Sequence, residues 1–235
     1  MPTRQVFRQA QRDLISAHER KSSLCAPFLS VLPVDGAALS VLASPAGQST
    51  MCASDDTAAR LDELQFDLGE GPCWDAMSTR LPVLAPDLST DGASSWPLFT
   101  NAVQQDASDV RAVYAFPLFV GSLDIGALDL YSSSHKPLER SQVTDATQLA
   151  SLAAWQVLRR ILADQPGEDP DTPGSYNRRE VHQATGMVLA QLNISADDAA
   201  LLLRAHAFSS GRSVAEVAND VVERRLTFTP DALSD

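Results

Sequence analysis

Cys73 is the residue whose type and position most suggest reactive chemistry in this chain. It follows Gly71 and Pro72, and proline at this place is typical of a first helical turn. Backbone amides at a helix start favour the thiolate form of cysteine, so Cys73 is a candidate redox or nitric-oxide sensor. The plainer alternative is a buried structural thiol, and the sequence leaves both hypotheses open.

The other residue types that catalyse reactions or bind metals do not form a recognisable pattern. Histidine lacks metal-ligand spacing to cysteine or to paired carboxylates, and it occurs as His18, His135, His182 and His206. The aspartates around Asp55 and Asp87 are typical of helix caps and turns. The sequence contains no glycine-rich phosphate loop, nucleophile elbow or His-Glu-x-x-His motif. We therefore expect no metal, no cofactor and no enzymatic activity.

Composition and cysteine content indicate the class of protein and its cellular compartment. The chain has 235 residues, 44% hydrophobic and 20% charged, as in globular proteins of one large domain or two smaller ones. Cys25, Cys52 and Cys73 are an odd number without a metal-type pair, which predicts reduced thiols and no disulfide. There is no apolar run of eighteen residues and no secretory signal pattern. We expect a cytoplasmic protein without a membrane span.

Three helix starts follow one another near the carboxyl end. Each has a polar capping residue with an acidic residue three places later, in Asn177–Glu180, Ser195–Asp198 and Ser213–Glu216. Gly211 is placed to end the second helix, and Pro230 lies beyond the third. Apolar residues recur at helical spacing after each start, so the sequence predicts a three-helix bundle over 175–228.

The first helix of this bundle has an unusual solvent side. Arg179, Gln183 and Gly186 fall on one stripe opposite Val181, and a stripe with small residues permits close approach by another surface. Arg178 and Arg179 stand in the first turn, where the helix dipole disfavours positive charge. The alternative is that both arginines are merely solvated. The second helix is apolar nearly all round, because Leu201, Ala205 and Phe208 lie away from its core side.

The bundle resembles the ANTAR domain, a three-helix RNA-binding module of bacterial transcription antiterminators. Four stretches carry the resemblance: Val181–Leu189, Asn193–Ala199, Leu203–Ala207 and Gly211–Ala218. The resemblance implies that the bundle binds RNA hairpins and that binding prevents formation of a terminator. Many family members have lysine just before the glycine of the first helix, where this chain has Thr185, so one cation of that surface is absent.

Combined with the solvent stripe, the resemblance gives a set of RNA-binding candidates. They are Arg178, Arg179, His182, Gln183, Gly186, Arg204 and Arg212. The net charge of −12 is unusual for a nucleic-acid binder, but residues 174–235 carry only −2 of it, with six arginines against eight acids. A near-neutral bundle predicts modest affinity that depends on shape, base contacts or dimerisation rather than on attraction to phosphate.

The residues before the bundle alternate between strand and helix patterns. Residues 1–33 contain an opening helix, and 34–140 contain two β-hairpins, 37–53 and 113–131, with helical and short strand segments between them. Paired strands with intervening helices predict an α+β domain built on an antiparallel sheet that is covered on at least one face.

This α+β segment resembles a GAF domain of the type that precedes ANTAR in actinobacterial proteins. The resemblance rests on Leu68–Cys73, Pro82–Val83, Trp96–Pro97, Phe116–Leu118 and Ile125–Leu128. It implies a small-molecule sensor, although the residues typical of cyclic-nucleotide-binding members are absent. Candidates to line a ligand pocket are Trp74, Trp96, Phe99, Tyr114 and Phe116, with core packing as the alternative for each.

Two segments connect the domains. Residues 141–163 predict a helix whose apolar stripe from Val143 to Ile161 can pack on the sheet, on the opening helix or on a second subunit. Residues 164–174 are acidic and proline-rich, as in linkers. We expect a homodimeric regulator whose GAF-like domain senses a small molecule and controls RNA binding. The alternatives are a helix-turn-helix DNA-binding regulator and a protein-protein adaptor that binds no nucleic acid.

Overall fold

The chain divides into two compact units, Met1–Tyr176 and Asn177–Asp235. A computed structural model describes residues 4–20, 22–42, 49–163 and 179–229, except for the side chains of residues 18, 19 and 179. Within these ranges, no single helix is long and apolar enough to cross a membrane. The predicted linker 164–174 lies outside the described residues.

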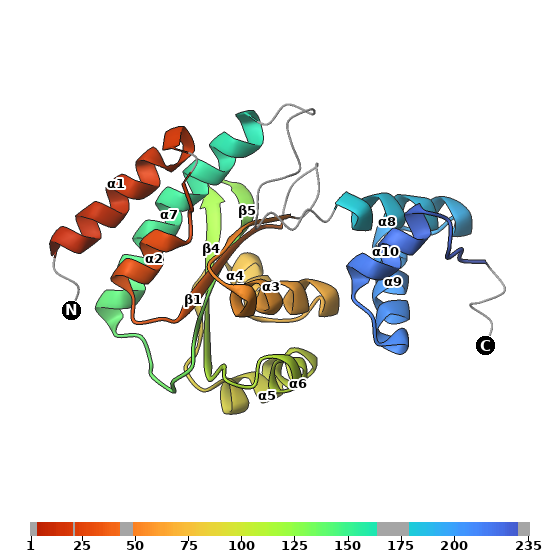
Figure 1. Cartoon of the computed structure of the whole chain (residues 1–235), viewed down its shortest axis with the longest axis horizontal. Coiled ribbons are helices and arrows are strands. Elements are labelled where there is room, and N and C mark those ends of the chain that lie inside the picture. Colours follow the sequence, from red (N-terminus) through yellow and green to blue (C-terminus); the bar gives the residue numbers. More distant parts are fainter. Residues whose placement is uncertain (1–3, 21, 43–48, 164–178, 230–235) are drawn as a thin grey trace. The chain divides into compact units, whose positions relative to one another are not determined.

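The first unit is an α+β domain with one antiparallel sheet (Figure 1). Its strands are β1 (Gly36–Val41), β2 (Ser49–Ala53), β3 (Val83–Ala85), β4 (Ala112–Val120) and β5 (Leu123–Ser132), in the order β2-β1-β5-β4-β3. Its helices are α1 (Arg4–Arg20), α2 (Ala26–Val31), α3 (Asp56–Leu68), α4 (Pro72–Thr79), the π-helical turn η1 (Leu88–Gly92), α5 (Ala93–Ser95), α6 (Pro97–Asp106) and α7 (Arg140–Ala163).

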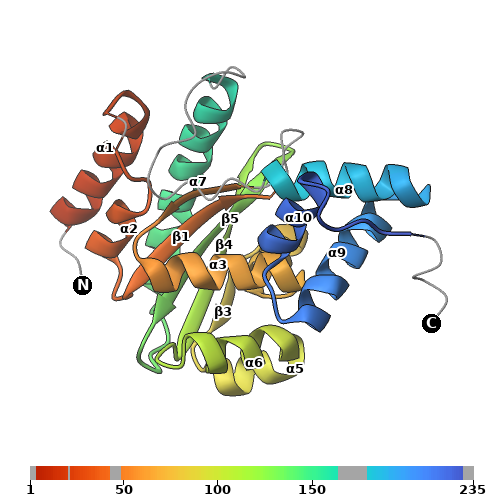
Figure 2. The ribbon, with the colours of Figure 1, turned by 45° about the vertical axis from the view of Figure 1, so that its right-hand side comes forward.

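Helices cover both faces of the sheet (Figures 1 and 2). The α1, α2 and α7 helices pack on one face in the larger core, whereas α3, α4 and α6 pack on the other. Because strand residues alternate between faces, Leu128 and Leu130 of β5 point to the α7 side while Ala127 points to the α4 side. The predicted antiparallel sheet is thus confirmed, with helices on two faces.

The apolar stripe of α7 is used inside its own unit. Leu149, Ala153 and Val157 are completely buried, and α7 packs on both α1 and β4. Arg160 Nη2 also donates to the carbonyl oxygen of Ser22 at 2.8 Å, which ties the end of α7 to the turn after α1. Of the three uses that the sequence left open for this stripe, packing on the sheet and on the opening helix are both observed.

A disulfide joins Cys25 and Cys52, so the prediction that no disulfide forms is wrong. Cys25 immediately precedes α2, and Cys52 lies in the edge strand β2. Their Cα atoms are 6.1 Å apart, although 27 residues separate them in the sequence. The count of three cysteines gave no sign of this pairing, because it depends on where α2 packs against the sheet.

The second unit is the predicted three-helix bundle, formed by α8 (Arg179–Leu192), α9 (Ala196–Ser210) and α10 (Val214–Val222). The caps at Ser195 and Ser213 are present, and Ser213 forms a complete capping box with Glu216. Gly211 ends α9 with a φ of 65°, a left-handed conformation that favours glycine. The predicted cap Asn177 lies outside the described residues.

Candidate functional site

The α8 helix presents the predicted solvent stripe. Val181, Ala184 and Val188 are buried against the other two helices, whereas His182 and Gln183 are exposed. Arg179 is the first residue of α8, but its side chain is not described, and Arg178 lies outside the described residues. The two arginines of the first turn therefore remain predictions.

Gly186 has no structural need to be glycine within this unit. A Cβ atom added there would meet no described residue within 4 Å, and Gly186 is not among the glycines with positive φ. Glycine in a helix interior costs about 1 kcal/mol relative to alanine. The bundle thus carries a destabilising residue on its open surface without a packing or backbone reason, as expected where another molecule approaches the helix closely.

Thr185 stands where many ANTAR domains have lysine, and its side chain is engaged locally. Its hydroxyl donates to the carbonyl oxygen of Val181 at 2.7 Å, one turn earlier on α8. The side chain is half-buried and carries no charge. It therefore cannot replace the missing cation on the surface.

The two remaining cation candidates differ in their surroundings. Arg204 lies half-buried on α9. Arg212 forms an ion pair with Asp220 at 2.7 Å and donates to the carbonyl oxygen of Glu216. Asp220 also pairs with Arg225 at 2.6 Å, and these two guanidinium groups, Arg212 first, hold the pKa of the Asp220 carboxyl below its usual range. Much of the positive charge of Arg212 is thus neutralised within the bundle.

The outer side of α9 is apolar, as predicted. Leu201 is 62% exposed and Phe208 is 70% exposed, and Ala205 between them is also exposed. Phe208 lies one helical turn after Arg204 on α9, and Arg212 follows the end of this helix.

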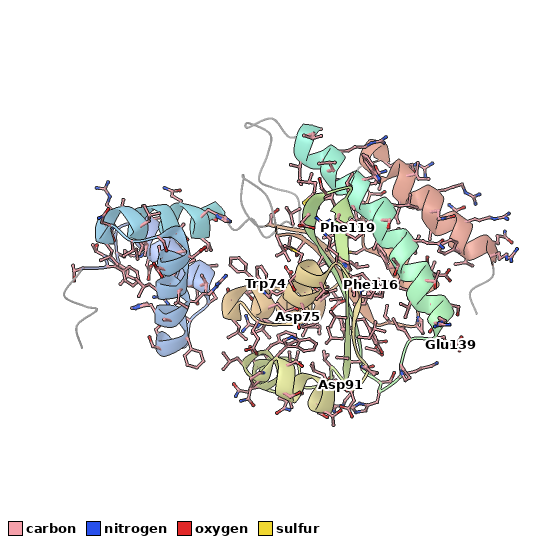
Figure 3. All side chains as sticks on the ribbon, turned by 180° about the vertical axis from the view of Figure 1, so that it is seen from behind. Trp74, Asp75, Asp91, Phe116, Phe119 and Glu139 are labelled. Atoms are coloured by element: carbon pink, nitrogen blue, oxygen red, sulfur yellow. A yellow bond between two sulfur atoms is a disulfide. The ribbon has the colours of Figure 1, made fainter. Side chains whose placement is uncertain are left out.

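The five aromatic candidates of the sensor domain do not lie together. Tyr114 and Phe116 belong to the core between the sheet and α7, whereas Trp96 and Phe99 pack between α6 and the opposite face. Trp74 lies on α4 on that opposite face, at the edge of a third cluster (Figure 3). No single pocket can therefore be lined by all five, and four of them are buried core residues.

A small depression lies elsewhere in the first unit, between η1, α6 and the start of β4. Its volume is about 70 Å³, and none of the five aromatic candidates lines it. The lining residues are Leu88, Ser89, Thr100, Val103, Gln104, Ser108, Val110, Arg111 and His135.

The Leu68–Cys73 motif joins three helices by polar contacts. Glu70 Oε1 accepts from the backbone amides of Leu98 and Phe99 at the start of α6, at 2.8 and 3.0 Å. The side-chain oxygen of Gln65 accepts from the Cys73 amide at 2.8 Å, which caps α4 from α3. Cys73 itself is 2% exposed, and its sulfur is not part of the disulfide. This burial supports the structural-thiol hypothesis for Cys73.

A buried group of acidic and polar residues near this motif was not identified from the sequence. It comprises Asp62 and Gln65 of α3, Ser40 of β1, Thr50 of β2 and Asp129 of β5. The only sequence signal is position, since Asp129 lies between two leucines within a predicted strand. Buried carboxyl groups are uncommon and often functional.

Comparison with known proteins agrees with this architecture. The GAF domain model matches residues 19–155, and the ANTAR domain model matches residues 176–222. The GAF match is wider than the predicted 34–140 and includes α2 and part of α7. No curated protein matches the chain.

Two solved structures show the same fold as the first unit. The GAF domain of a phosphoenolpyruvate-protein phosphotransferase from Acinetobacter has a TM-score of 0.50 at 10% identity, over 71% of this chain and 99% of that one. The corresponding GAF domain from Coxiella burnetii has a TM-score of 0.52 at 14% identity, over 69% and 96%. The chain therefore belongs to the GAF domain family and carries an ANTAR domain at its carboxyl end.

Proposed function

We propose that this protein is a signal-responsive regulator that binds RNA hairpins through its ANTAR domain and so promotes transcription antitermination. ANTAR is an RNA-binding antitermination domain and GAF is a small-molecule-sensing domain, which supports this general role. The GAF unit would bind an uncharged or weakly polar small molecule, or serve mainly as a dimer scaffold. Because its partner is RNA, we place the protein in the cytoplasm.

The observation that carries the proposal is the open α8 stripe around Gly186. The exposed side chains of His182 and Gln183 lie beside a glycine that nothing in the bundle requires. A phosphate backbone can approach a helix most closely where no side chain intervenes, while neighbouring polar side chains form hydrogen bonds with bases or phosphates.

Gly186→Ala tests the proposal because it should raise the stability of the bundle and lower its affinity for RNA. Alanine should stabilise the bundle by up to about 1 kcal/mol, since it favours the helix and meets no neighbour. The same methyl group should weaken hairpin binding several-fold by holding the RNA away. Urea unfolding followed by circular dichroism measures the first effect, and titration of a labelled hairpin recovered by crosslinking from cells measures the second.

The control for this experiment is Met187→Leu, a change of similar size at the next, half-buried position of α8. It should leave RNA affinity unchanged. A DNA duplex of the hairpin sequence serves as the competing ligand, because α10 contains no lysine or arginine of the kind that a DNA recognition helix uses. Stronger binding to the duplex would favour the DNA-binding alternative, and no binding to either would favour the adaptor.

A further inference from the structure

Asp129 is a buried carboxyl group without conventional hydrogen-bond partners. It lies in the middle of β5, is 5% exposed and stands opposite Ala38 of β1 and Ala115 of β4. Neither carboxyl oxygen has a hydrogen-bond partner within the described structure. An ionised carboxylate in such surroundings is strongly disfavoured unless a positive charge or several donors compensate for the lost water.

A second buried carboxyl group, Asp62 on α3, affects the ionisation of Asp129 through its charge. Asp62 is 2% exposed and accepts hydrogen bonds from the hydroxyls of Ser40 and Thr50, both at 2.5 Å. Burial, and next the charge of Asp62, raise the pKa of Asp129 to about 8. Gln65 acts in the opposite direction, although no hydrogen bond of normal geometry joins its Nε2 atom to Asp129.

Within the described residues, no positive charge compensates Asp129, because Arg60, the arginine of α3, pairs with Glu63 and Asp106 instead. On its side of the sheet, α3 contributes Asp62 and the neutral amide of Gln65, and α4 contributes the buried thiol of Cys73. The facing strands contribute alanines, and Tyr131 on β5 donates its hydroxyl to Asp55. Two adjacent carboxylates in this layer would therefore repel each other in a region of low dielectric constant.

We propose that Asp129 holds a proton at neutral pH beside Asp62 and that loss of this proton loosens the layer that α3 and α4 form on the sheet. With one proton present, the pair carries a single negative charge that the Ser40 and Thr50 hydroxyls already stabilise. With the proton lost, a second buried charge appears without donors. This regulatory device uses residues of the sensor unit alone and does not depend on the RNA-binding role.

The geometry indicates which elements move when the proton is lost. Asp129 sits in a central strand that pairs on both sides, whereas α4 has only eight residues and ends at Arg80 with a φ of 56°. The α4 helix is attached to α3 by Gln65, which caps it, and by Trp74 Nε1, which donates to the Gln65 carbonyl oxygen at 2.7 Å. Movement of α3 would thus change the surroundings of Trp74.

Unfolding of the full chain between pH 5 and 9 tests the proposal, with Asp129→Asn as the variant. The folded pKa of Asp129 lies above its ordinary value of 3.8, so the folded protein holds a proton that the unfolded chain has lost. Stability should therefore fall as pH rises towards 8, with the folding equilibrium constant dropping by up to about tenfold per pH unit. Above pH 8 it should level off. Asn keeps the shape without the charge and should remove this dependence. Asp109→Asn, at an exposed carboxylate, should leave it unchanged.

Two direct measurements follow the native protein and do not require the Asp129→Asn variant to fold. The ¹³C shift of the Asp129 carboxyl carbon should titrate near pH 8 in the native protein and at lower pH in Asp62→Asn. Trp74 fluorescence should shift to the red over the same range, and the shift should vanish in Trp74→Phe. The proposal would be overturned if the stability of the native protein and of Asp129→Asn depended on pH in the same way. It would also be overturned if the Asp129 carboxyl titrated near pH 4, or if Asp62→Asn left its titration unchanged.

Discussion

At the scale of single residues, Asp220 limits the positive charge that the ANTAR domain can offer to RNA. It pairs with both Arg212 and Arg225, and these arginines keep its pKa low, so it stays anionic at neutral pH. Any stability from these pairs is present above the ordinary carboxyl pKa and is lost only as pH falls through the lowered one. At physiological pH the two arginines are therefore always partly neutralised.

Asp220→Asn should strengthen hairpin binding if Arg212 faces the RNA. The change releases Arg212 from its ion pair, whereas Arg225 keeps its pair with Glu223, and it should raise affinity about threefold at low salt, with a steeper salt dependence. Titrations at several salt concentrations measure both quantities. Asp197→Asn removes the same charge from the first turn of α9, and none of the ion pairs of the described residues joins Asp197 to these arginines. An equal gain in that control would mean that net charge alone matters and that Arg212 has no specific role.

The candidate residues show where sequence reasoning reaches its limit. Helical periodicity placed His182, Gln183 and Gly186 on one exposed stripe, because buried alanine and valine positions fix the inward side of a helix. Strand alternation predicts that Tyr114 and Phe116 share a face. It does not tell which helices cover that face, and they proved to be α1, α2 and α7 rather than the helices that carry the tryptophans. The buried Asp62 and Asp129 pair was missed because the two residues meet only in the folded domain.

At the scale of elements, the long segments follow from the sequence and the short ones do not. Both hairpins and the three bundle helices occur near their predicted positions because each has a clear period and a cap or turn residue. The α2 helix, η1 and α5 are six residues or fewer, too short for a periodic signal. Their placement depends on packing, which also brings Cys25 to Cys52.

The Cys25–Cys52 disulfide should stabilise the GAF unit substantially. It closes a 27-residue separation between α2 and β2, and restricting the unfolded chain over such a loop is worth about 3.5 kcal/mol. Urea unfolding in the presence of a reductant should show this loss, and Cys25→Ala, Cys52→Ala should match the reduced native protein. Cys73→Ala provides the control, since any loss of stability that this substitution causes should be the same with and without reductant. Alkylation of Cys25 and Cys52 in the native, unreduced protein would contradict the pairing.

At the scale of the whole molecule, the net charge is distributed unequally between the two units. Most of the net charge of −12 lies before residue 174, while the ANTAR unit is close to neutral. Long-range attraction to RNA is therefore weak, and binding must come from contacts at short range. Two RNA-binding bundles in one assembly would raise the effective affinity without any new contact, which gives dimerisation a direct functional value.

We predict that the protein is a homodimer held by the outer side of α7. The stripe from Val143 to Ile161 cannot serve this purpose in the way the sequence suggested, because Leu149 and Val157 are completely buried in their own unit. The opposite side exposes Trp155 by 53% and Leu162 by 74%, two helical turns apart. Large apolar side chains exposed in this way are typical of surfaces that associate.

Trp155→Glu combined with Leu162→Glu should convert the dimer to a monomer. The fold should survive, since both side chains project from the unit, and circular dichroism can verify this. Light scattering at micromolar concentration measures the mass. Leu98→Glu on α6, where the leucine is 47% exposed, introduces a similar change elsewhere on the same unit and should leave the dimer intact. If the native protein is a monomer, or if the double variant keeps the dimer mass, this side of α7 is not the dimer interface.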